Sequence, residues 1–132
     1  MARKKARSYY QRTGINNYKV ISCRIKDENL EALLNSSIKK TYVVDEGKTV
    51  NPWNPQEVIR LALYKIGAVR KDAVSMGGDT SMWRPGESIK TSFYKADAEQ
   101  AREFAAEHNM TVQQLIISAL YELFIEQTPT AA

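Results

Sequence analysis

The chain is poor in the residues from which catalytic and metal sites are commonly built. Its 132 residues include one cysteine, Cys23, and one histidine, His108. A disulfide within the chain is therefore excluded, and so is a zinc site made of cysteine and histidine ligands. No nucleophile and carboxylate pattern accompanies His108, which we expect at a helix end. We therefore expect a protein that is not an enzyme and that uses no metal or cofactor.

Long apolar runs are also missing. No stretch of the sequence approaches the ~18 consecutive apolar residues that a membrane-spanning helix needs. The basic N-terminus is not followed by the apolar segment of a signal peptide. We therefore expect no membrane partner and a cytoplasmic location.

Charge is present in quantity and is unevenly divided. The net charge is +4; residues 1–86 hold 16 Lys and Arg against 8 Asp and Glu, whereas residues 87–132 hold 3 against 7. Residues 1–17 form a basic N-terminal arm without an acidic residue. A basic front and an acidic back are typical of a protein that presents one face to a polyanion, because clustered Lys and Arg neutralise phosphates.

Residues 18–67 predict a strand followed by two helices. In the strand, residues 18–26, an apolar face of Ile21, Cys23 and Ile25 alternates with a second face of Val20, Ser22 and Arg24. Asp27 is a plausible N-cap for the first helix. Its apolar stripe is expected to be Leu30, Leu33, Leu34 and Ile38.

An insertion, residues 39–53, separates these two helices. It predicts a small β-hairpin, with Trp53 packed over it as a lid. Asn54 is the expected cap of the next helix, with Pro55 in its first turn and Glu57 reaching back to the cap. Gly67 ends that helix. Its apolar face consists of Val58, Ile59, Ala62, Leu63 and Ile66.

Residues 68–86 have the composition of a linker, and residues 87–127 repeat the strand, helix, helix order. In the strand, residues 87–94, Ile89, Thr91 and Phe93 alternate with Lys90, Ser92 and Tyr94. Asp97 with Gln100 resembles a capping box, and Thr111 is the expected cap of the last helix. The wide apolar stripe of residues 112–124 predicts that this helix is the most buried one. Residues 128–132 form a tail.

The two units align when Ser22 is placed over Ser92. In this order of elements, in Phe93, in residues 105–111 and in the pair Leu115-Ile116, the chain resembles a tandem ribbon-helix-helix protein of the MetJ/Arc class. The resemblance implies a mainly α fold with a short antiparallel two-stranded β-ribbon. It implies further that one chain forms an intrachain pseudo-dimer, which carries the hairpin as an insertion in its first unit.

The same resemblance implies sequence-specific binding of double-stranded DNA, with the ribbon in the major groove. The expected function is a transcriptional repressor of phage or plasmid type, associated with the nucleoid. A relaxosome or partition accessory factor and a protein-binding inhibitor module on the same scaffold stay open, as does self-association on DNA. The expected base-reading residues are Val20, Ser22, Arg24, Lys90, Ser92 and Tyr94. The expected phosphate contacts are Arg3, Lys4, Lys5 and Arg7 in the arm, with Asn54, Gln56, Thr111 and Val112 at the helix starts. For Trp53, a contact to DNA or to a second molecule is the alternative to packing.

Overall fold

A computed structural model describes residues 18–38, 40–45, 47–76, 83–84 and 86–127. Four helices and two small antiparallel sheets make a mixed α/β fold in this part of the chain. The elements, in chain order, are β1 (Tyr18–Cys23), α2 (Glu28–Ser37), β2 (Tyr42–Asp45), β3 (Lys48–Val50), α3 (Pro55–Lys65), the 3-10 helix η2 (Lys71–Ala73), β4 (Ile89–Tyr94), α4 (Lys95–Glu107) and α5 (Val112–Gln127). None of the helices described is long and apolar enough to cross a membrane.

Strands β1 and β4, which lie far apart in the sequence, pair to form an antiparallel ribbon. Ile21 lies opposite Thr91, Val20 opposite Ser92, and Ser22 opposite Lys90. The side chains that alternation assigned to the apolar face are buried, as predicted; these are Ile21, Cys23, Ile25, Ile89, Thr91 and Phe93. The other face of the ribbon is left toward the outside.

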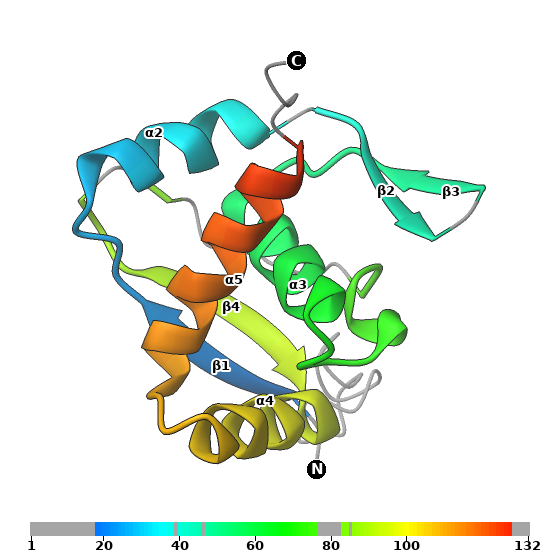
Figure 1. Ribbon diagram of the computed structural model, residues 1–132, viewed down its shortest axis with the longest axis vertical. Helices are drawn as coiled ribbons and strands as arrows, with labels where there is room; N and C mark the ends of the chain where they lie inside the picture. Colours follow the sequence, from blue (N-terminus) through cyan, green and yellow to red (C-terminus); the bar gives the residue numbers. More distant parts are fainter. Residues whose placement is uncertain (1–17, 39, 46, 77–82, 85, 128–132) are drawn as a thin grey trace, which may run out of the picture.

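Helices α3 and α5 form the centre of the molecule. They pack against each other, α3 also contacts β4, and α5 also contacts β1. In Figure 1, α5 and α3 cross one side of the ribbon, while α2 and α4 lie at opposite ends of this helix pair. The ribbon is therefore covered by helices on the face that carries its buried residues.

The sequences of α3 and α5 match each other closely. Residues 54–66 align with residues 111–123 without a gap, and the identical pairs include Ile59 with Ile116 and Leu63 with Leu120. Those four side chains are fully buried. Gln56 and Tyr64 also have identical counterparts, Gln113 and Tyr121. The two central helices therefore present equivalent surfaces to each other.

Helix α3, rather than α5, is the most buried helix, which corrects the sequence-based expectation. Every residue of α3 from Pro55 to Leu63 except Glu57 is buried. The cause is the segment after it, because Ala68, Val69, Ala73 and Val74 are also buried and η2 packs against α3. The segment that reads as a linker thus covers a face of α3 that would otherwise be solvent-exposed.

Most of the expected helix ends are confirmed. The Asp27 carboxylate accepts hydrogen bonds from the backbone N–H groups of Asn29 and Leu30, at 2.8 and 3.2 Å. Gly67, with a φ of +85°, ends α3, and the N–H of Ala68 reaches back to the Leu63 carbonyl at 2.9 Å. This is the left-handed residue and backward hydrogen bond typical of a helix C-terminus.

Two expectations about the helices are wrong, one about a buried face and one about the start of a helix. Leu33 is 41% exposed, because α2 contacts α3 and α5 through a narrow side that buries Leu30 and Leu34. Asp97 and Gln100 do not form a capping box, because α4 begins at Lys95, directly after the strand. Asp97 is consequently inside the helix.

The hairpin predicted within residues 39–53 is confirmed as β2 and β3, and it projects from the body of the molecule (Figure 1). Its base is fixed by Asp45, which accepts a hydrogen bond from the Tyr64 hydroxyl at 2.9 Å and forms an ion pair with Lys71. These contacts hold the pKa of Asp45 below its ordinary value, with the Lys71 contact as the main cause. Trp53 is 70% exposed, so its predicted role as a packing lid is wrong.

Candidate nucleic-acid interface

The outward face of the β1/β4 ribbon brings together the six side chains predicted to read bases. Val20 is 57% exposed, and Ser22 and Lys90 are also exposed. Ser92 and Tyr94 are half-buried, while Arg24 is exposed just beyond the last residue of β1. The register places Val20 beside Ser92 and Ser22 beside Lys90, so these residues form a continuous strip.

One end of this strip is cationic. Arg24 and Lys90 both line a cavity of about 510 Å³, whose lining also includes Glu87, Ser88 and Trp83. Neither cationic side chain has an ion-pair partner within the residues that the structure describes. We call Ser22, Arg24 and Lys90 the cationic end of the ribbon.

The other end is aromatic. The rings of Tyr18 and Tyr94 lie edge to face, with centroids 5.3 Å apart, and the Arg70 guanidinium lies 5.9 Å from the Tyr94 centroid. Burial raises the pKa of the Tyr94 hydroxyl above its ordinary value. We call Tyr18, Val20 and Tyr94 the aromatic end.

A buried carboxylate fixes the aromatic end. Asp97 is fully buried and accepts hydrogen bonds from Arg70 through its backbone N–H at 3.0 Å, its Nε at 2.9 Å and its Nη2 at 3.0 Å. This two-pronged ion pair raises the pKa of Arg70 and orients its guanidinium plane. Arg70 is thus held in position over the Tyr94 ring, a contact that could not be foreseen from local sequence patterns.

Two buried polar side chains of α3 hold the edge of β4. Gln56 donates to the carbonyl of Lys90 at 3.3 Å, and Arg60 donates to the carbonyl of Ser92 at 2.9 Å. Sequence reasoning missed this role, because a Gln and an Arg in an amphipathic helix are ordinarily assigned to its solvent side. The flanking Ile59 and Leu61, both of them apolar, were the available signal.

The helix starts, where phosphate contacts were predicted, are already engaged by their own side chains. At α3, the Asn54 Oδ1 accepts from the Glu57 N–H at 2.9 Å, and the Glu57 Oε1 accepts from the Trp53 N–H at 2.9 Å. The Gln56 side chain is 1% exposed and turned toward β4, so the phosphate contact predicted for the backbone N–H at this position stays a prediction. In this capping box the Glu57 carboxylate thus accepts from the backbone N–H of Trp53, and not from that of the cap residue Asn54 as expected.

At α5, Thr111 and Gln114 form a reciprocal capping box. The Thr111 Oγ1 accepts from the Gln114 N–H at 3.1 Å, and the Gln114 Oε1 accepts from the Thr111 N–H at 2.9 Å. Thr111 is exposed and Val112 is half-buried. Their predicted phosphate contacts stay predictions, as does that of Asn54; Arg3, Lys4, Lys5 and Arg7 lie outside the described residues.

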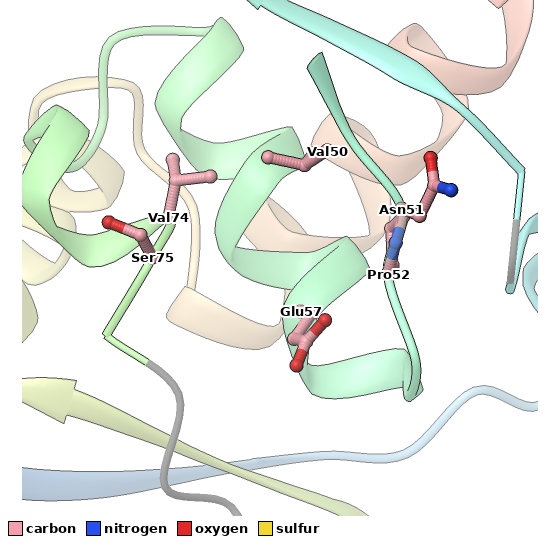
Figure 2. A pocket seen from close by; sticks show the side chains of 6 residues that line it. All are labelled: Val50, Asn51, Pro52, Glu57, Val74 and Ser75. Atoms are coloured by element: carbon pink, nitrogen blue, oxygen red, sulfur yellow. The ribbon is translucent and has the colours of Figure 1, made fainter. Parts of the chain in front are cut away.

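A smaller cavity of about 260 Å³ lies between the end of β3, the start of α3 and the residues after η2 (Figure 2). Glu57 is the one titratable residue in its lining, and its carboxylate is occupied by the Trp53 N–H. Within the described part of the chain, no group of three or more His, Cys, Asp and Glu residues is placed to hold a metal ion.

Comparisons with protein-family models, with curated proteins and with solved structures find no match to this chain.

Proposed function

We propose that the chain binds double-stranded DNA by inserting the outward face of the β1/β4 ribbon into the major groove, in a tandem ribbon-helix-helix arrangement. The observation that carries this proposal is the strip formed by Val20 with Ser92 and Ser22 with Lys90, which is flanked by Arg24. A two-stranded ribbon fits the major groove, which is about 12 Å wide. The physiological role that follows is transcriptional repression in the nucleoid.

The internal symmetry of the ribbon supports the tandem arrangement. When Ser22 is aligned with Ser92, Val20 corresponds to Lys90 and Arg24 to Tyr94. The observed register is consistent with this alignment, because it places Ile21 opposite its aligned counterpart Thr91, where a pseudo-twofold axis would pass. The gap-free match between α3 and α5, which pack against each other, supports the same arrangement.

The charges of the two sides of the molecule support the orientation on DNA. Residues 18–26 and 88–96, which contain the ribbon strands and their flanks, carry five basic residues and no acidic one. Residues 97–127, in α4 and α5, carry six acidic residues and one basic residue. A polyanion is therefore attracted to the ribbon and repelled from the helices on the other side.

The exposure of the ribbon's outward face also supports the proposed DNA binding. Unpaired or uncovered β-structure with exposed side chains is a surface on which other molecules dock. Here α3 covers the edge of β4 through Gln56 and Arg60, so pairing with a further strand at that edge is blocked. The outward side chains, rather than the strand edge, are thus the part of the ribbon left to recognise a partner.

The proposal is tested by replacing the two cations of the ribbon in one variant, Arg24→Ala with Lys90→Ala. Each contact to a base contributes about 1–3 kcal/mol, so affinity for a selected duplex should fall by roughly a hundredfold or more. Lys40→Ala with Lys48→Ala is the matched control, since it removes the same charge at exposed positions of the hairpin region. Fluorescence anisotropy at fixed salt measures both.

Equal losses in the two double variants would contradict the ribbon assignment, because they would reflect net charge alone. Absence of any binding to random or selected duplex at low salt would favour the protein-binding inhibitor module. A relaxosome or partition accessory factor shares the DNA-binding step, and reporter repression in cells separates it from a repressor.

A further inference from the structure

We propose that the ribbon reads DNA in one fixed orientation, on a non-palindromic site. A guanine-containing half-site lies under the cationic end, and a thymine-rich half-site lies under the aromatic end. This inference rests on the proposed DNA binding and adds to it the chemical class of each half of the site.

The two ends differ at the positions that symmetry makes equivalent. Val20 corresponds to Lys90, and Arg24 corresponds to Tyr94. Of the three equivalent pairs on the outward face, the serines alone are identical. Because the ribbon is antiparallel, Arg24 and Lys90 fall at one end, and Val20 and Tyr94 fall at the other. The two substitutions between the units therefore act in the same direction, because together they make one end of the ribbon cationic and the other end free of cations among these four residues.

The cationic end has the chemistry of a guanine reader. Arg24 and Lys90 line the same cavity and form no ion pair among the described residues; Glu87 also lines it, and its Oε1 accepts from the Arg84 N–H at 3.2 Å. Guanine presents two acceptors, N7 and O6, in the major groove, and Arg and Lys are the side chains that most often contact them. Ser22 lies opposite Lys90, and its hydroxyl group can form a hydrogen bond with either a donor or an acceptor on a base.

The aromatic end has the chemistry of a thymine reader. Val20 is 57% exposed and offers an apolar surface to the C5 methyl group that thymine alone presents in the major groove. Tyr18 and Tyr94 extend that surface. The Arg70 guanidinium at this end is committed to Asp97 and to the Tyr94 face. Lys19 and Lys95 follow Tyr18 and Tyr94 in the chain and are exposed, and neither belongs to the strip of outward side chains defined by Val20, Ser22, Arg24, Lys90, Ser92 and Tyr94.

The two ends are also fixed by different contacts. Asp97 corresponds to Asp27 in the alignment, yet Asp97 binds Arg70 whereas Asp27 caps α2 and accepts a hydrogen bond from Tyr121 at 2.6 Å. An ion pair between the buried Asp97 and the half-exposed Arg70 therefore supports the aromatic end, and an exposed cap stands at the corresponding place beside the cationic end. The two halves cannot exchange roles by rotating the protein through half a turn.

The orientation is measured with a DNA-cleaving iron chelate attached to a single cysteine. Cys23 is fully buried, with its pKa raised to about 11, so it does not compete for the label. Lys26→Cys marks the cationic end and Ala96→Cys marks the aromatic end; both positions are exposed and correspond in the alignment. The DNA is a duplex taken from selection on random sequence.

We expect each label to cut on one side of the selected site, the two labels to cut on opposite sides, and guanine to be enriched near the Lys26 label. Exchange of the ends by Val20→Lys with Lys90→Val should reduce the ratio of cutting between the two sides by about tenfold or more. A palindromic selected site with equal cutting on both sides would overturn this inference while leaving DNA binding intact. Absence of any selected duplex would instead overturn the proposed function itself.

Discussion

The Nη1 atom of Arg60, a fully buried residue of α3, lies 2.9 Å from the carbonyl oxygen of Ser92 on β4. The outward-facing strand is thereby tied to the most buried helix of the molecule. A strand edge otherwise exposes unpaired backbone groups, and here a side chain satisfies one of them. The position of the ribbon consequently depends on a residue that lies outside it.

Arg60→Ile introduces the residue that α5 has at the equivalent position, Ile117. We expect the free energy of unfolding to fall by about 1–3 kcal/mol, because the Ser92 carbonyl loses a buried donor. Urea unfolding followed by circular dichroism measures the change. Arg102→Ile, on the exposed side of α4, is the control, and an equal effect of the two substitutions would show that the Ser92 contact contributes nothing.

Tyr121→Phe should destabilise the protein in a pH-dependent way. The Tyr121 hydroxyl is the main cause of the lowered pKa of Asp27. A carboxylate whose pKa is lower in the folded state stabilises the fold fully above its ordinary pKa of 3.8, and this stabilisation is lost as the pH falls through the lowered value. The difference between wild type and variant should thus be fully present at about pH 7 and should shrink progressively as the pH falls below 3.8 and through the lowered pKa of Asp27.

Tyr64→Phe is the matched comparison for this experiment, since Tyr64 occupies the equivalent position and contacts Asp45. The sign of its pH dependence should be the same, because the pKa of Asp45 is also lowered. Asp45 keeps Lys71, the larger cause of its shift, and the effect of Tyr64→Phe should accordingly be smaller. A destabilisation by Tyr121→Phe that stays constant with pH would rule out the Asp27 contact as its source.

Gly67→Ala should lower the free energy of unfolding by about 1 kcal/mol. The φ of +85° at Gly67 is the cause, because the space around an added Cβ is open. Asn109, which follows α4, also has a positive φ, of +57°. Its replacement by glycine, Asn109→Gly, is the reverse kind of substitution and should be neutral or stabilising. Thermal unfolding of both variants tests this, and a neutral Gly67→Ala would contradict the conformational explanation.

Removal of residues 1–13 should weaken binding to all duplexes by a similar factor, since this segment carries five basic residues and no acidic one. If each of them neutralises one phosphate, the slope of log affinity against log salt should become shallower by about 4 units. Titrations at several salt concentrations measure the slope. An unchanged slope would show that the arm does not contact DNA, and a loss confined to one sequence would indicate base reading instead.

The strands, the hairpin and three of the helix caps were predictable because they depend on local patterns. Alternation assigned Ile89 and Lys90 to opposite faces, and Asp27 and Thr111 stand immediately before the helices that they cap. The capping partner of Thr111, Gln114, follows the same short-range rule. These features need nothing from distant parts of the chain.

The contacts that fix the candidate site depend on residues far apart in the sequence and could not be predicted. Asp97 pairs with Arg70, and Arg60 reaches Ser92; in each case a charged side chain is drawn inward by a partner on another element. Leu33 shows the converse, an apolar residue left outside because its helix contacts the core along a narrow line. The burial of α3 likewise follows from a covering segment whose composition resembles that of a loop.

The joining of both strands in one polypeptide has an evolutionary consequence. In a homodimer a single codon change alters a contact residue in both subunits, so a new contact always arises on both sides at once. Here Ser22 and Ser92 are encoded separately, as are Gln56 and Gln113. One residue of each pair can therefore change while its counterpart is retained, and under the proposed DNA binding each half of the bound site can change independently of the other.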